Sequence, residues 1–243
     1  MNAHLKTRGG WSSLAILTSF FCLAFAGCAV NLETGPPRHE MRTIDLDTSE
    51  TARVDLGMGA GELRVGGGAR ALMNADFNYS VPAWKPEVVY HSFAGRADLS
   101  IQQPATAGHR GNGKYDWDLR LNNEIPVDLL LHFGAGKARL TLGTLNLRSV
   151  EVAMGVGQID MDLRGMPKHD YDVRIRGGVG EATVYLPKNA GVRAKVEGGL
   201  GSFKVIGLHS EKRYWVNDWY DSSRPHVRVD IRGGIGQINL IAE

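Results

Sequence analysis

Along most of the chain, apolar and polar residues alternate one by one, and a Gly-x-Gly step interrupts the alternation at intervals. The stretch from Asp172 to Leu186, "DVRIRGGVGEATVYL", shows this most clearly, because apolar residues occupy alternate positions on both sides of its glycines. Alternation with a period of two is typical of β-strands that bury one face. The pattern therefore predicts strands throughout, and no stretch shows a helical period.

The Gly-x-Gly step recurs six times, in a larger unit of strand, glycines and strand. The glycine pairs are Gly59 and Gly61, Gly134 and Gly136, Gly155 and Gly157, Gly178 and Gly180, Gly199 and Gly201, and Gly234 and Gly236. Three successive spacings are 21, 23 and 21 residues. Self-similarity at a fixed period of this length is typical of stacked-repeat architectures.

The glycines are expected to form corners. After the second glycine of each pair, the alternation restarts three residues on, and such an odd step would normally turn later side chains to the opposite face. A bend at the glycines removes the conflict, because glycine adopts positive φ and leaves room for a neighbouring backbone. We count the middle residues, such as Val179, Leu200 and Ile235, among the inward side chains. The fold class predicted is all-β: a β-solenoid of stacked two-strand repeats of about 21 residues with Gly-x-Gly corners.

The first 27 residues resemble an export signal. Lys6 and Arg8 precede an apolar segment at 14–26 that is too short to span a membrane. The sequence then reads Phe25-Ala26-Gly27-Cys28, which resembles a bacterial lipobox. We therefore predict a lipoprotein signal peptide at 1–27 and lipidation of Cys28; the alternative is an ordinary secretory peptide that is cut near Ala26.

Residues 28–42 contain a Gly-Pro-Pro run and no apolar period, and they are predicted to be a lipidated tether. Residues 43–243 are predicted to be a single domain with an aromatic insertion near 208–224. Ala29 follows the lipobox cysteine where an aspartate would resemble an inner-membrane retention signal. The expected location is the bacterial cell envelope, with the outer membrane favoured in a Gram-negative host.

Processing would leave Cys28 as the last cysteine, because Cys22 lies within the leader. No disulfide within the chain could then form. Removal of Lys6 and Arg8 leaves 26 basic and 26 acidic residues, so the mature net charge is zero. This balance argues against nucleic acid as a partner, and membrane association is expected through the lipid.

Several motifs have simpler interpretations than a chemical site. Glycine-rich phosphate loops need a helix directly after the glycines, whereas a strand pattern follows here. The calcium-binding β-roll needs Asp where this chain has Ala182, Phe203 and Ile238. The paired carboxylates Asp116/Asp118 and Asp160/Asp162 are expected to be solvated ladders on an outer face. We predict no cofactor, metal site or catalytic residue.

The insertion near 208–224 exceeds what the repeat requires, and it contains Tyr214, Trp215, Trp219 and Tyr220. One interpretation is a cap that covers an end of the stacked repeats, whose strand edges need protection. The other is a recognition surface, because exposed Trp and Tyr anchor protein partners and stack on sugars. These four aromatic residues are the candidate interaction residues.

Taken together, the lipobox, the first "GMGAGELRV" unit, the later Gly-x-Gly units and the aromatic "YWVNDWYDSS" carry a resemblance to the toast-rack family of bacterial envelope proteins. The chain is also similar to the C-terminal β-solenoid domain of LiaF-type cell-wall-active antibiotic response proteins. The resemblance spans roughly 43–243 and implies a β-solenoid without known catalytic residues. LiaF-type proteins are implicated in envelope-stress signalling, but they usually carry transmembrane helices that this chain lacks in its sequence.

The function expected is that of a non-enzymatic, lipid-anchored envelope scaffold or interaction protein, in a role that could include the envelope-stress response. A protein partner in the envelope is expected. Two alternatives stay open: a module that binds cell-wall glycans, and a β-helical polysaccharide-active enzyme. Exposed coplanar aromatics would favour the former, and carboxylates converging in a cleft would favour the latter.

Overall fold

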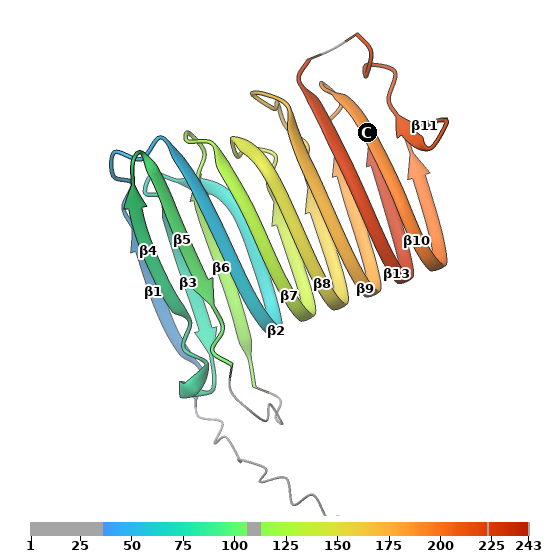
Figure 1. The fold of residues 1–243 in the computed structure, drawn as a ribbon. Coiled ribbons are helices and arrows are strands. Elements are labelled where there is room, and N and C mark those ends of the chain that lie inside the picture. The colour runs from blue at the N-terminus through green and yellow to red at the C-terminus, as the bar shows by residue number, and fades with distance from the viewer. Residues whose placement is uncertain (1–35, 106–112, 223, 243) are drawn as a thin grey trace, which may run out of the picture. The chain divides into compact units, whose positions relative to one another are not determined.

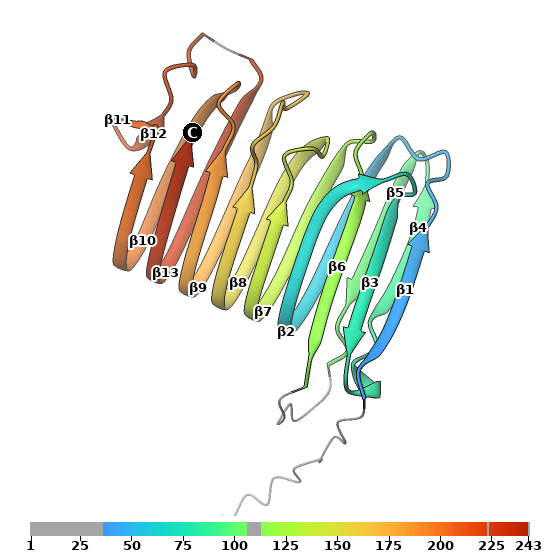
Figure 2. The same cartoon turned by 180° about the vertical axis from the view of Figure 1, so that it is seen from behind.

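Long bent strands dominate the computed structural model, which describes residues 36–105, 113–222 and 224–242. These residues belong to one unit, 31–243, and form an open sheet of thirteen strands (Figures 1 and 2). The strands are β1 (Arg38–Ile44), β2 (Thr51–Ala69), β3 (Met73–Tyr79), β4 (Glu87–Phe93), β5 (Arg96–Gln102), β6 (Tyr115–Asn122), β7 (Val127–Thr141), β8 (Leu147–Asp162), β9 (Tyr171–Leu186), β10 (Gly191–Ile206), β11 (His209–Glu211), β12 (Tyr214–Val216) and β13 (His226–Ala242). A 3-10 helix, η1 (Pro82–Trp84), precedes β4. The all-β prediction is confirmed, whereas the predicted leader and Cys28 lie outside the described residues.

Six strands, β2, β7, β8, β9, β10 and β13, bend at their glycines and so contribute to two facing layers. The first halves form a layer in the order β4-β5-β2-β7-β8-β9-β13-β10-β12-β11, and the second halves form a layer in the order β1-β3-β6-β2-β7-β8-β9-β13-β10. The six bent strands pair in parallel and keep their glycines in register. Their bends line one edge of the sheet, at the bottom of Figure 1, and we call it the bend edge.

Gly180 illustrates why the bend requires glycine. Its φ of 144° lies in a region that side-chain-bearing residues rarely adopt. A Cβ built on it would lie 1.8 Å from the carbonyl oxygen of Gly157 in the neighbouring strand. Gly157 in turn lies against Gly136, so the bends stack backbone on backbone.

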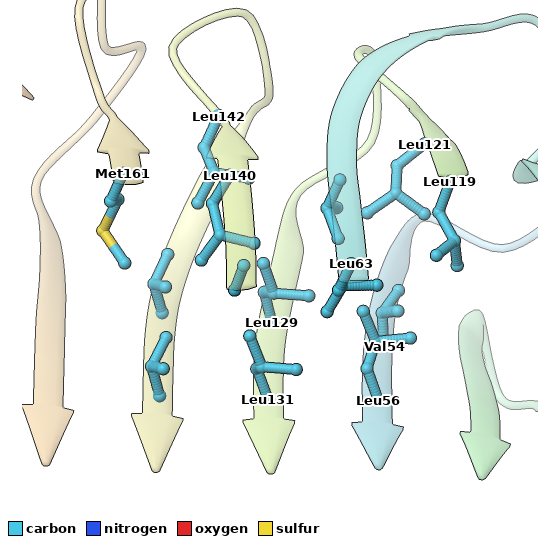
Figure 3. Close-up of a cluster of buried hydrophobic side chains, with 14 of the residues drawn as sticks. Val54, Leu56, Leu63, Leu119, Leu121, Leu129, Leu131, Leu140, Leu142 and Met161 are labelled. Atoms are coloured by element: carbon cyan, nitrogen blue, oxygen red, sulfur yellow. The ribbon is translucent and has the colours of Figure 1, made fainter. Parts of the chain in front are cut away.

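Apolar side chains from both layers meet in one interior (Figure 3). Leu129 and Leu131 enter from the first half of β7, Leu140 enters from its second half, and Leu142 enters from the residue directly after the strand. All four are at most 1% exposed. The restart of alternation after the glycines therefore keeps both halves of the strand pointed inward, as the sequence predicts.

The middle residues of the Gly-x-Gly steps are not part of the buried core, and here the sequence-based assignment is wrong. Val179, Leu200 and Ile235 are exposed at the bend edge. The physical reason is their place at the corner, where glycines stand on both sides of each residue and no adjacent side chain in the same strand covers it. Alternation alone could not reveal this, since the position continues the apolar series.

The strand order and one boundary differ from the simplest interpretation of the repeats. Strand β13 lies between β9 and β10 and pairs with both, so β10 does not pair with β9, the repeat that precedes it in the chain. Strand β1 begins at Arg38, within the stretch predicted as a tether. Its lack of an apolar period is explained by its place at the edge of the second layer, where neither face is fully covered.

We expect Gly180→Ala to destabilise the fold by about 3 kcal/mol or more, because both strained φ and backbone overlap oppose the new methyl group. Gly177→Ala is the matched control: it lies in the same strand, and a Cβ there would meet nothing within 4 Å. Urea unfolding of both variants measures the difference. Equal unfolding midpoints would contradict the role assigned to the bend.

Candidate interaction surface

The aromatic insertion links β10 to β13 at the far end of the first layer. Strands β11 and β12 form a small hairpin within it, and Val216 and Trp215 of β12 pair with Arg193 and Ala194 of β10. The insertion therefore extends the first layer by two short strands, whereas no described strand extends the second layer beyond β10.

Trp215 lies on the inner side of the insertion. Its ring contacts that of Phe203, which belongs to the second layer, with centroids 5.7 Å apart in an edge-to-face arrangement. Both side chains are only partly covered, and Val216 beside them is buried. Trp215 thus bridges the two layers at the open end of the interior, which is the arrangement expected of a cap.

Asn217 fixes the base of the insertion. This buried side chain accepts a hydrogen bond from the amide of Val192 and donates one to the carbonyl of Ala190, each at 2.8 Å. The amide of Asn217 also donates to the carbonyl of Val192 at 3.1 Å. The chain beyond β12 is therefore tied to the start of β10 rather than loosely draped over it.

The outer side of the insertion carries a different arrangement. The guanidinium of Arg193 lies 4.8 Å from the ring centroid of Tyr214 and 5.2 Å from that of Tyr220. Cations over aromatic faces are attracted by the ring quadrupole. Trp219 lies in the same segment and is 59% exposed. We call Arg193, Tyr214, Trp219 and Tyr220 the aromatic patch.

The structure thus divides the four aromatic residues that the sequence singles out. Trp215 contributes to the cap, while Tyr214, Trp219 and Tyr220 belong to the outer side. Arg193 was missed by sequence reasoning, because it precedes Tyr214 by 21 residues and only the pairing of β10 with β12 brings the two together. No local signal could have revealed it.

Charged groups hold β13 in place where the insertion ends. Asp170, just before β9, accepts a hydrogen bond from the amide of His226 at 2.9 Å and pairs with Arg228 at 3.4 Å. Arg228 also donates to Asp172 at 2.6 Å. The amide hydrogen bond from His226, followed by the nearby positive charges, lowers the pKa of Asp170. Bonding to Asp172 raises the pKa of Arg228.

The carboxylate pairs predicted to be solvated ladders do lie on the outer face of the second layer. Asp160 is 3.9 Å from Lys137, and Asp162 pairs with Arg164 at 2.7 Å. Hydrogen bonds from Arg164 lower the pKa of Asp162. Asp116 and Asp118 pair with lysine and arginine neighbours in the same way. The lowered pKa of Asp162 therefore arises from its local interaction with Arg164.

A cavity of about 270 Å³ lies between the layers near the bends of β9, β13 and β10. Its walls are mostly apolar side chains and glycine backbone, and Glu181 and Arg232 are the ionisable residues that line it. Among the described residues, no group of three or more histidine, cysteine or carboxylate side chains is placed to hold a metal ion. Within the same ranges, no helix has the length and apolar character needed to cross a bilayer.

A family model described as the N-terminal domain of toast_rack, DUF2154, matches residues 33–185, more than half of the chain. The chain belongs to the toast-rack family. The resemblance noted in the sequence is therefore confirmed. No match was found among curated proteins.

Solved structures extend this comparison. A "putative cell adhesion protein" from Clostridium sporogenes is 34% identical to this toast-rack protein, with a TM-score of 0.81, over 86% of this chain and 100% of that one. A "putative adhesin" from Bacteroides fragilis is 9% identical with a TM-score of 0.29, over 85% and 97% of the two chains. A "putative lipid binding protein" from Parabacteroides distasonis is 8% identical with a TM-score of 0.24, over 85% and 97%. The last two TM-scores are too low to support an argument about this chain.

We expect Asn217→Ala to cost about 1–3 kcal/mol of stability, because it leaves buried backbone groups at Val192 and Ala190 without their partner. Urea unfolding and hydrogen exchange at the Val192 amide measure the loss. Asp218→Ala is the control, since this exposed neighbour makes only a surface ion pair with His209. Unchanged exchange at Val192 in the Asn217 variant would contradict the proposed attachment.

Stability near β13 should depend on pH through Asp170. Its folded-state pKa lies below the ordinary value of 3.8, so its contribution is present above that value and is lost as the pH falls toward the folded pKa. We expect the stability difference between the parent and Asp170→Asn to narrow as the pH falls from about 5 to about 2. Urea midpoints across this range test it, and a constant difference would show that the charge of Asp170 does not contribute.

Proposed function

We propose that this toast-rack protein is a lipid-anchored, non-enzymatic interaction protein of the bacterial cell envelope, with Cys28 as the lipidated residue. In a host with two membranes, its place is the outer one. The bent strands act as a rigid scaffold, which we class as a short β-solenoid. The resemblance to LiaF-type proteins supports a role in the envelope-stress response.

The observation that carries the proposal is the aromatic patch. A cap requires only inward side chains such as Trp215, yet the same insertion leaves Trp219 exposed and stacks Arg193 beside two tyrosines. Trp, Tyr and Arg are the residues most enriched at interaction hot spots. The base of the insertion is fixed by Asn217, so the patch is held in place before a partner binds. The similarity to a protein described as a "putative cell adhesion protein", which covers 86% of this chain, supports the same interpretation.

A cell-wall glycan is the second candidate partner. Sugars stack on exposed aromatic rings and accept hydrogen bonds from planar guanidinium groups, and the patch offers both through Trp219 and Arg193. An enzyme is a weaker candidate, because polysaccharide cleavage needs two carboxyl groups that converge on one bond. The described cavity has Glu181 as the carboxylate on its walls.

We expect Trp219→Ser to abolish capture of a discrete partner by crosslinking in the cell, because it removes the exposed anchor without disturbing the core. Phe93→Ser is the matched control, as Phe93 is also exposed but lies in β4 at the other end of the first layer. The captured material is identified for the parent and both variants.

Loss of a protein partner in the Trp219 variant alone supports the proposal. If the parent captures no protein but binds isolated peptidoglycan, and the Trp219 variant loses this binding, the partner is a glycan and not a protein. Identical capture by the parent and both variants would exclude the aromatic patch as the interaction surface.

A further inference from the structure

The bend edge presents a row of exposed apolar side chains, one from the middle of each Gly-x-Gly step. The row consists of Ala60, Ala135, Val156, Val179, Ile235 and Leu200, in their spatial order from β2 to β10. Val156, Val179 and Ile235 are 55%, 47% and 56% exposed, and Leu200 is 75% exposed. Contiguous exposed apolar surface of this kind marks an interaction site more often than single exposed residues do. We call it the bend row.

The bend row is continuous because the strands that carry it are neighbours in the sheet. Five steps of about 4.8 Å between strands give it a length of about 24 Å. Glycines stand on both sides of each member, so no adjacent side chain in the same strand covers it. The side chains grow from alanine at β2 and β7 to isoleucine and leucine at β13 and β10.

The larger members of the row also border the cavity. Val179, Leu200 and Ile235 line it together with inner residues such as Phe203 and Val196. Apolar surface thus continues from the bend edge into a space between the layers. On the other side of the row, the residues directly after the second glycines are polar in all six strands: Glu62, Lys137, Gln158, Glu181, Gln237 and Ser202.

The chain enters the described sheet at this same edge. Arg38, the first residue of β1, is opposite Tyr79 of β3, and Tyr79 is opposite Tyr115 of β6. The next residue of β6, Asp116, is opposite Glu62, which directly follows Gly61. The start of β1 is therefore level with the bends. Nine residues lie between Cys28 and Arg38, and the ten steps that join the two span at most about 35 Å when extended.

We propose that the bend edge lies on a lipid bilayer, with the side chains of the bend row inserted at the boundary between headgroups and acyl chains. This inference rests on the proposed lipid anchor at Cys28. Two features of the protein favour a bilayer as the occupant: the short N-terminal connection starts at the bend edge, and the row is an uncharged apolar line bordered by polar residues. Such an amphipathic arrangement is typical of surfaces that lie in the membrane interface.

The lipid and the bend row then attach the protein at two separate places along one edge. The N-terminal connection is at the β1 end, whereas the bulkiest members of the row are at the β10 end. Two attachments fix the edge along the membrane, while a lipid alone would allow the domain to tumble. The aromatic patch includes Arg193, which lies near the start of β10 and far from the bends. The patch is therefore turned away from the bilayer.

The test places one cysteine at a time in the full chain, in its processed and lipidated form. Ile235→Cys and Val179→Cys report on the bend row, and Asn189→Cys reports on the exposed loop between β9 and β10 at the opposite edge. Each protein is added to preformed vesicles of phosphatidylethanolamine and phosphatidylglycerol and treated with a membrane-impermeant maleimide. Rates are normalised to those of the same variants unfolded in urea.

We expect the two bend-row cysteines to react about tenfold more slowly than Asn189→Cys, because a thiol in apolar surroundings ionises poorly and the reagent stays in water. If the bend-row cysteines and Asn189→Cys react at equal rates in protein that floats with the vesicles, the bend-row inference is overturned while the anchor stands. If the bend-row cysteines become more reactive when the protein is diluted over more lipid, a second copy of the chain covers the row, and this result also overturns the inference.

Failure of the anchor gives a different result. If Cys28 carries no lipid, the proposed localisation is wrong, and the row is judged by flotation of the unlipidated chain with the same vesicles. Flotation that is lost in the double variant Leu200→Ser, Ile235→Ser would still support the row. A chain that does not float at all would overturn both.

Discussion

The close stacking of backbone at the bends is the constraint on which the rest of the structure depends. Each second glycine of a Gly-x-Gly step lies against a carbonyl oxygen of the neighbouring chain segment, at a distance that no Cβ could share. The positive φ of these glycines turns the chain, and the turn keeps apolar positions pointed inward on both sides of an odd step. The two layers, the common interior and the straight bend edge all follow from this repeated contact.

A stack of bent strands has two ends, and this protein finishes them differently. At the β1 end, the second layer continues into β6, β3 and β1, which add an aromatic cluster in which Phe77 and Trp117 meet edge to face with centroids 5.5 Å apart. At the β10 end, the insertion covers part of the first layer and Trp215 reaches Phe203 in the second. Both additions cover part of the interior, and at the β10 end the insertion pairs with the first-layer edge, because unpaired strand edges otherwise pair with other chains.

The same construction separates two surfaces by chemistry and by place. The bend edge is apolar because its middle residues lie outside the core yet need no polar partner. The aromatic patch is amphipathic, combining Arg193 with tyrosine rings and the exposed Trp219 at the β10 end. A membrane-facing edge and a partner-facing patch are compatible in one molecule, because the length of the bent strands holds them apart.

The strands, the bends and most of the core could be predicted from the residues alone, because a two-residue period and a regular glycine step act locally and repeat. The sequence also identified the insertion and its aromatic residues. The exposure of Val179, Leu200 and Ile235 became visible only in the folded chain, since alternation continues through these positions and does not reveal how far a corner residue is covered. Likewise, six similar repeats cannot specify their own order. Strand β13 pairs with β9, where Arg228 forms ion pairs with Asp170 and Asp172. The long insertion gives the chain enough length to return to this place.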